Sequence, residues 1–311
     1  MCMYGCPYGY IYSSAQTLPH LKGAGDFRHQ PDVIVRSVQE SADRVRISGY
    51  HRLTREPLDF EAERVYLAAG VIPTTGILLR SLRAYDRPVP IKDSQYFLLP
   101  LGLARRIPNV RQEPLHALSQ LYLEILDPQV SPYTVHLQVY SYNDLIGRTV
   151  SGALGPLAKW LPFLARELEG RLLLIQGYLH SAESSRIVAT LRKNAADGKE
   201  TLLLQAEANP TAKAVVRRVV RKLLQQAPRL GAVPLPMLLQ MGKPGRGFHA
   251  GGSFPMRANP GSFETDILGR PAGWRRVCAV DATVLPSIPA TAITLTVMAN
   301  AHRIGWDSGT T

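Results

Sequence analysis

One histidine lies in a glycine-rich segment with the composition of a catalytic turn. His249 is followed by Ala-Gly-Gly-Ser-Phe-Pro-Met, and Gly247 stands two residues before it. An imidazole exchanges a proton near neutral pH, and flanking glycines let a substrate and a cofactor approach its ring closely. An isolated histidine more often occupies an ordinary polar loop. Residue type and spacing therefore make His249 a candidate general base and leave the polar-loop alternative open.

A carboxylate follows a short apolar strand further along the chain. Asp281 comes directly after the apolar residues 277–280 and precedes Ala282 and Thr283. A carboxylate at a strand end accepts hydrogen bonds from a hydroxyl-rich ligand more strongly than a neutral group does. An aspartate at this position can also cap its own turn. Asp281 is therefore either a ligand contact or a turn cap.

A strand, a glycine and a helix follow one another near residue 70. Residues 64–69 form a compact apolar strand that ends at Gly70, and residues 77–82 suit a helix. In such a unit the N-terminus of the helix presents unpaired backbone N–H groups that favour an anionic ligand. The order of these elements predicts a ligand-binding turn at Gly70.

Taken together, these segments resemble signatures of the glucose-methanol-choline (GMC) flavoprotein oxidoreductases. The histidine segment matches the pattern H-x-x-G-[ST]-x-x-M at His249, Gly252, Ser253 and Met256. Residues 281–283 match the Asp-Ala-Thr end of the family's V-x-D-[AG]-[ST] strand, and residues 68–70 match A-[AT]-G. Residues 71–82 resemble the second GMC signature. Residues 2–7 and 13–15 resemble a segment that precedes the adenine-contacting strand in a bacterial branch of the family.

The resemblance implies an FAD-dependent oxidoreductase that acts on CH–OH donors, either alcohols or sugar-like compounds. His249 would be the base that takes the hydroxyl proton while hydride passes to the flavin, and an external acceptor would reoxidise the cofactor. The substrate and the electron acceptor stay open. The residues that the resemblance assigns to FAD are Val38, whose backbone would meet the adenine, together with Ala69, Gly70, Asp281, Ala282, Ala292 and Ile293.

The chain departs from the family pattern at three kinds of position. The family places a second histidine or asparagine where this sequence has Ala292, and alanine cannot hydrogen-bond a substrate oxygen. In the second signature Thr75 replaces a proline and Leu82 replaces a glycine. The family's N-terminal G-x-G-x-x-G fingerprint is also missing; the local match at residues 245–250 follows no strand and opens no helix. We therefore expect a truncated form with weak FAD binding and low activity.

The order of elements predicts a mixed α/β (α+β) protein in which an incomplete FAD-binding domain is interrupted by a substrate domain. We expect residues 1–94 and 241–311 to form the FAD-binding part and residues 95–240 to form the substrate domain. The strand-like runs in the middle predict one mostly antiparallel sheet, at residues 118–126, 133–142, 172–180, 185–191 and 200–206. Strands are also predicted at residues 33–38 and 44–49 with a return at 55–60, and helices at residues 157–168, 211–226 and 292–304.

Composition excludes several classes of protein. The three cysteines, Cys2, Cys6 and Cys278, cannot form a disulfide framework and lack zinc-site spacing, so we expect no metal. The chain has no apolar run of membrane-spanning length, and residues 1–7 lack the layout of a secretory signal, so we expect a cytoplasmic protein without a transmembrane segment.

Two further hypotheses remain, and the net charge of +12 motivates the first of them, a nucleic-acid partner. Residues 211–226 combine an apolar stripe with a row of Lys and Arg, which indicates a core-packing helix with a solvated basic face. Because the remaining basic residues are scattered, we expect no nucleic-acid partner. The other hypothesis is a pseudoenzyme or partner-dependent subunit, in which a separate chain supplies the missing βαβ segment.

Overall fold

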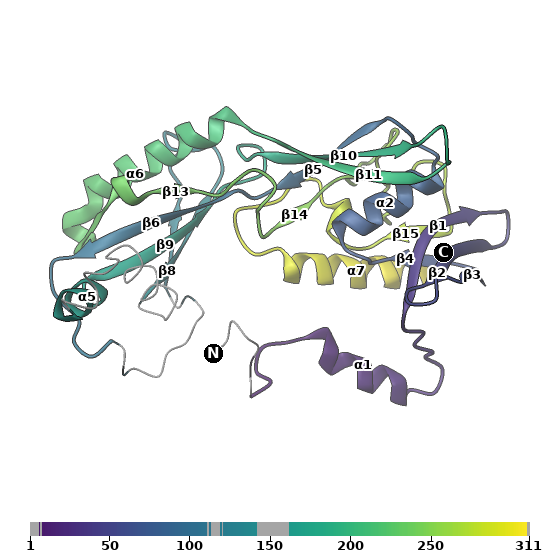
Figure 1. Ribbon diagram of the computed structural model, residues 1–311, viewed down its shortest axis with the longest axis horizontal. Coiled ribbons are helices and arrows are strands. Elements are labelled where there is room, and N and C mark those ends of the chain that lie inside the picture. Colours follow the sequence, from purple (N-terminus) through teal and green to yellow (C-terminus); the bar gives the residue numbers. More distant parts are fainter. Residues whose placement is uncertain are drawn as a thin grey trace. The chain divides into compact units, whose positions relative to one another are not determined.

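The computed structural model describes residues 6, 8–110, 112, 119, 121–141 and 162–309 (Figure 1). The chain folds into two compact units. The first draws on the ranges Met1–His29, Tyr96–Tyr178 and Lys213–Gly242, and the second on Gln30–Gln95, Leu179–Ala212 and Lys243–Thr311. Cys2, residues 118 and 120 of one expected strand and residues 157–161 of one expected helix lie outside the described residues. All of the candidate site residues belong to the second unit.

An antiparallel meander begins the second unit. It consists of β1 (Val33–Glu40), β2 (Val45–His51) and β3 (Pro57–Ala62), which pair in chain order. The two strands predicted at 33–38 and 44–49 and the return at 55–60 are thus confirmed. Val38 and Val45 are fully buried and belong to the same apolar core as Leu78 and Leu79 of the following helix. The meander therefore shares its core with the helix that carries the glycine turn.

Two short parallel strands carry the glycine turn and the aspartate. β4 (Val65–Leu67) pairs with β15 (Val277–Ala279), so both strands run toward the same edge. β4 leads through Gly70 into α2 (Val71–Ser81), and β15 leads through Asp281 into the short 3-10 helix η3 (Ala282–Val284). α2 starts at Val71, six residues before the helix predicted at 77–82. Pro73 is tolerated there because it lies in the first turn, where no N–H is needed for a bond within the helix. α7 (Thr294–Gly309) closes the unit.

The second unit also contains a four-stranded antiparallel sheet. Its order is β11-β10-β5-β14, formed by β5 (Pro88–Asp93), β10 (Arg186–Lys193), β11 (Glu200–Glu207) and β14 (Ala250–Gly251). β10 and β11 were expected in the middle sheet, and the structure corrects this assignment. Their alternating pattern predicts strands, but the partner strand β5 is distant in sequence and its Pro88 and Pro90 disguise it. This sheet brings the His249 segment onto the edge of β5.

The first unit is built on a second antiparallel sheet. Its order is β12-β6-β9-β8-β7, and β13 also pairs with β6. The strands are β6 (Tyr96–Leu103), β7 (Leu121–Ile125), β8 (Val135–Tyr140), β9 (Leu172–Tyr178), β12 (Ala232–Pro234) and β13 (Gln240–Met241). The unit also holds α1 (Ser14–Gly23), α5 (Pro162–Glu169) and the 3-10 helix η2 (Pro236–Leu238). The expected antiparallel sheet exists, with three of its five predicted strands.

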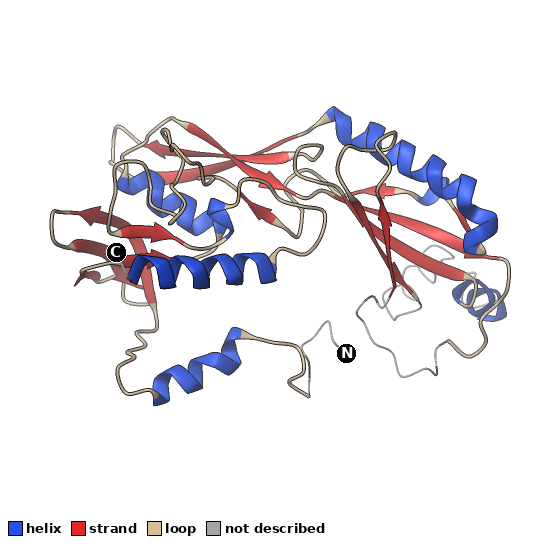
Figure 2. Cartoon of the chain, turned by 180° about the vertical axis from the view of Figure 1, so that it is seen from behind, coloured by secondary structure: helices blue, strands red, loops and turns tan. Residues whose placement is uncertain are grey.

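A long helix, α6 (Pro210–Leu230), lies along this sheet (Figures 1 and 2). Its apolar positions from Val215 to Leu223 are buried, which confirms the predicted core-packing stripe. Two residues of its basic face bond within the unit: Arg218 to the carbonyl of Val130 and Lys222 to Asp127. Within the described part of the chain, no helix combines the length and apolar content needed to cross a bilayer.

Candidate cofactor and catalytic site

The glycine turn after β4 is open on its outer side. Gly70 has φ +90° and ψ 156°, a conformation that residues with a side chain rarely adopt, and no atom lies within 4 Å of where its Cβ would be. Ala68, Ala69 and Gly70 are all exposed. The turn therefore offers bare backbone and a helix N-terminus to a ligand.

Asp281 holds the two turns together. Its Oδ2 accepts the backbone N–H of Gly70 at 2.9 Å and the hydroxyl of Thr74 at 2.5 Å. Its Oδ1 accepts the N–H of Thr283 at 2.9 Å and so caps η3. Asp281 thus caps its own turn, as the second alternative from the sequence has it. It also bonds to Gly70, which lies 211 positions away in the sequence. One lone pair of Oδ1 remains for a ligand hydroxyl.

We expect Asp281→Asn to lower the free energy of unfolding by about 1–2 kcal/mol, because the amide keeps one acceptor and loses the charge that strengthens these bonds. Urea titration followed by circular dichroism would measure the change. Asp43→Asn, an exposed turn aspartate, is a suitable control. Equal stability of the Asp281 variant and the wild type would contradict the bridging role.

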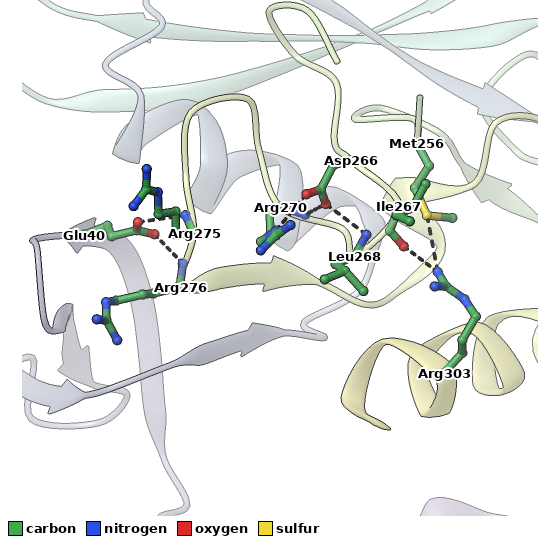
Figure 3. Close-up of polar contacts among 9 residues, drawn as sticks. All are labelled: Glu40, Met256, Asp266, Ile267, Leu268, Arg270, Arg275, Arg276 and Arg303. Atoms are coloured by element: carbon green, nitrogen blue, oxygen red, sulfur yellow. Dashed lines mark hydrogen bonds and ion pairs between the residues drawn. The ribbon is translucent and has the colours of Figure 1, made fainter. Parts of the chain in front are cut away.

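The histidine segment runs beside η3. Three backbone N–H groups, of Gly252, Phe254 and Met256, donate to the carbonyls of Ala282, Thr283 and Val284 at 2.8, 3.0 and 2.8 Å. The carbonyl of His249 accepts the N–H of Ser94 at 2.9 Å. Figure 3 shows Arg303 of α7 bonded to the carbonyl of Ile267 and to the sulfur of Met256. The structure thus places the two sequence motifs side by side.

A hydroxyl pair explains one departure from the family pattern. Thr75, which replaces the proline of the second signature, lies 2.6 Å from Ser253 of the histidine segment, and both side chains are buried. Thr75 also donates to the carbonyl of Val71. The threonine therefore links α2 to the histidine turn through a hydrogen bond that proline cannot make.

The remaining predicted residues occupy different surroundings. Val38 is 2% exposed, and its N–H donates to Ser81 at 2.8 Å, so this amide is already bonded within the protein. Ala282 and Ile293 are buried together with Leu285 and Ile288, whereas Ala292 is exposed just before α7. Direct hydrogen bonds therefore connect Gly70 to Asp281, and Ala282 to the histidine segment. Val38 is bonded to α2 through Ser81 and belongs to the same apolar core as Phe254 of the histidine segment.

Sequence reasoning missed three residues near the histidine segment. Asp93 is 1% exposed, and its Oδ2 accepts the N–H of Gly247 at 3.1 Å. Lys92 donates to the carbonyl of Pro286, and burial lowers its pKa. Burial, and to a lesser degree the charge of Lys92, lower the pKa of His180. No motif marks these residues. The polar Lys-Asp-Ser run at the end of β5 is a signal for Lys92 and Asp93, and none is available for His180.

The residues that are present fit part of an FAD site. The exposed backbone at Ala69 and Gly70 allows a flat or anionic group to approach, and the N-terminus of α2 favours negative charge. The free lone pair of Asp281 suits a hydroxyl donor such as a ribityl chain. These three features are what a flavin dinucleotide requires of the turn after β4.

Comparisons with known proteins bear on the fold. No protein-family model matches the sequence, and no curated protein matches it. Among solved structures the chain is similar to pyridoxine 4-oxidase from Mesorbium loti, with 15% identity and a TM-score of 0.56 over 88% of this chain and 56% of that one. It is also similar to an FAD-dependent oxidoreductase from Chaetomium thermophilum, with 12% identity and a TM-score of 0.54 over 93% and 63%.

The chain thus spans less than two thirds of the length of either structure. Both similarities cover most of this chain. At these identities the likeness identifies the fold, and the chain has the mixed α/β fold of these two oxidoreductases.

Proposed function

We propose that this chain is a GMC-type FAD-dependent oxidoreductase that oxidises the CH–OH group of an alcohol or a sugar-like compound. The observation that carries the proposal is the ladder of backbone hydrogen bonds between residues 252–256 and η3. This ladder fixes the segment of His249 next to the turn that Asp281 ties to Gly70. A base and an open dinucleotide-type turn are therefore held by the same short element.

In this proposal each group of the chain has a stated task. His249 accepts the hydroxyl proton of the donor, and the bond from its carbonyl to Ser94 fixes the main chain of the turn. Gly70 and the first turn of α2 would hold FAD, and Asp281 would accept a hydrogen bond from one of its hydroxyl groups. FAD, when bound, would supply the acceptor for the hydride that leaves the carbon bearing this hydroxyl. The donor thereby loses one proton and one hydride and becomes a carbonyl compound.

The visible absorbance of the purified chain, before and after incubation with excess FAD and with free FAD at the same concentration as the reference, tests the proposal. We expect a bound-flavin spectrum after incubation, and a smaller bound fraction for Asp281→Ala. Asp43→Ala, the same change at an exposed aspartate in the turn between β1 and β2, serves as the control. A wild-type protein that folds and retains no flavin at any FAD concentration would contradict the proposal.

A second candidate is a partner-dependent form of the same protein, in which another polypeptide completes the cofactor site. Within the described ranges the outer edge of β4 has no strand partner. Nearby, α7 exposes three large apolar side chains: Leu295 at 79%, Met298 at 41% and Trp306 at 72%. Exposed strand edges and apolar stripes of this kind are usually covered by another element.

Fusing the N-terminal βαβ segment of a GMC protein to this chain tests the second candidate. If that segment covers β4 and α7, we expect FAD affinity to rise by about tenfold or more, which corresponds to about 1.4 kcal/mol. A fusion that also carries Leu295→Asp and Trp306→Asp should lose the gain. An affinity that the fusion leaves unchanged would argue against a partner at this surface.

A further inference from the structure

A cavity of the second unit lies near the amino-terminal ends of β4 and β15, opposite the ends that lead to Gly70 and Asp281. Its volume is about 670 Å³, within the range of small-molecule sites. It is lined mainly by the end of β1, the residue before β4 and the loop before β15. We call it the arginine pocket, and its characteristic residues are Glu40, Arg64, Arg270, Trp274, Arg275 and Arg276.

The carboxylate of Glu40 builds one wall of the arginine pocket. It accepts the backbone N–H of Arg275 at 2.8 Å and that of Arg276 at 2.9 Å (Figure 3). Both of its oxygens are therefore used by the main chain. Glu40 thereby fixes the loop before β15. Its carboxylate makes no ion pair with the guanidinium group of Arg275 or Arg276.

The other polar contacts leave positive charge in the pocket. Arg276 donates to the carbonyls of Ala42 and Glu63, and Arg64 donates to the carbonyl of Ser308. Arg270 pairs with Asp266 at 2.7 Å. Among the residues that line the pocket and their ion-pair partners, there are four guanidinium groups and two carboxylates, those of Glu40 and Asp266. The excess is two positive charges, and guanidinium donors remain free on Arg64 and Arg276.

Arg275 differs from the other three arginines. It is exposed, and its guanidinium makes no ion pair or hydrogen bond with any residue that the structure describes. Trp274, next to it, lines the cavity and is partly buried against the apolar core. A cavity lined by an unpaired guanidinium, an aromatic side chain and further guanidinium groups can bind a phosphate carried on an organic group.

We propose that the arginine pocket binds the phosphate group of a small phosphate monoester, with Arg275 as the principal cation and Trp274 as the wall that contacts the organic part. The pocket uses none of the residues assigned to FAD or to catalysis. Its occupation is therefore independent of the proposed function.

Calorimetric titration with phenyl phosphate at low ionic strength tests this proposal, because the probe combines a phosphate monoester with one aromatic ring. We expect saturable binding at one site. Arg275→Gln should weaken it by about tenfold or more, as loss of a charge-assisted hydrogen bond predicts. Arg192→Gln removes an exposed charge of the same kind from β10, outside the pocket, and should leave the affinity within about twofold.

Two comparisons complete the experiment. Benzoate has the same ring and one negative charge, and we expect it to bind at least about tenfold more weakly than phenyl phosphate. Equal affinity for benzoate would overturn the assignment to phosphate. Equal weakening by Arg275→Gln and Arg192→Gln would show a diffuse attraction to a basic chain and would overturn the site, as would the absence of binding.

Discussion

His249→Ala is expected to reduce alcohol-dependent bleaching of bound flavin by about 10²- to 10⁴-fold, the range of a positioned general base. The reason is that alanine removes the ring that takes the hydroxyl proton. The bond from the backbone carbonyl at this position to Ser94 does not depend on the side chain and should survive. Stopped-flow absorbance under anaerobic conditions would measure the rate of flavin reduction.

Two measurements separate this effect from a loss of folding or of cofactor. The flavin content of His249→Ala should equal that of the wild type, since none of the contacts that join Gly70, Thr74 and Asp281 involve the imidazole. His20→Ala replaces an exposed histidine of α1, in the other unit, and should reduce flavin at the wild-type rate. Unimpaired reduction by His249→Ala would remove His249 from the mechanism.

Asp93→Asn is expected to flatten the dependence of stability on pH between about pH 4 and pH 8. Asp93 is almost completely buried, and burial raises its pKa from 3.8 to about 6, against the opposing effect of the N–H groups of Gly247 and Ser94. The folded protein therefore binds this proton more tightly than the unfolded chain. The protonated Asp93 therefore adds about 3 kcal/mol to the free energy of unfolding below about pH 4. This contribution is lost as the pH rises through about 6.

Urea denaturation at pH 5 and pH 8 would measure this effect. The wild type should be less stable at pH 8 than at pH 5 by about 1.4 kcal/mol, because one pH unit of the loss lies between pH 5 and the pKa of about 6. The Asp93→Asn variant should lack this difference. Asp59→Asn is a matched control, because Asp59 is exposed and its bond to Arg46 lowers its pKa to about 2, below the tested range. A wild-type slope that persists in Asp93→Asn would assign the titration to another group.

The same carboxyl also explains a glycine of the histidine segment. A Cβ on Gly247 would lie 1.6 Å from Oδ1 of Asp93, so only glycine fits there. The glycines around His249 predicted close approach by a substrate and a cofactor. At Gly247 the close approach is to a buried carboxyl of the protein itself.

The local pattern of apolar and polar residues was sufficient to predict most of the strands and helices of this chain. Alternating apolar residues predicted β1, β2, β8, β9, β10 and β11 at nearly their final positions, and the apolar stripe with its basic face predicted α6. These features depend on neighbours within a few residues, since a strand repeats every two residues and a helix every 3.6. The spacing around His249 and Asp281 likewise marked both residues as candidates for chemistry.

Only the tertiary structure decided which of these pieces meet. The pairing of β10 with β5, the bridge from Asp281 to Gly70, the Thr75–Ser253 hydroxyl pair and the burial of Asp93 against Gly247 join residues more than ninety positions apart. Periodicity gives each segment its conformation and its apolar face, but it names no partner for that face. Partners are chosen by burial and hydrogen bonding over the whole chain, which is why the sequence identified His249 and Asp281 while the fold revealed what holds them together.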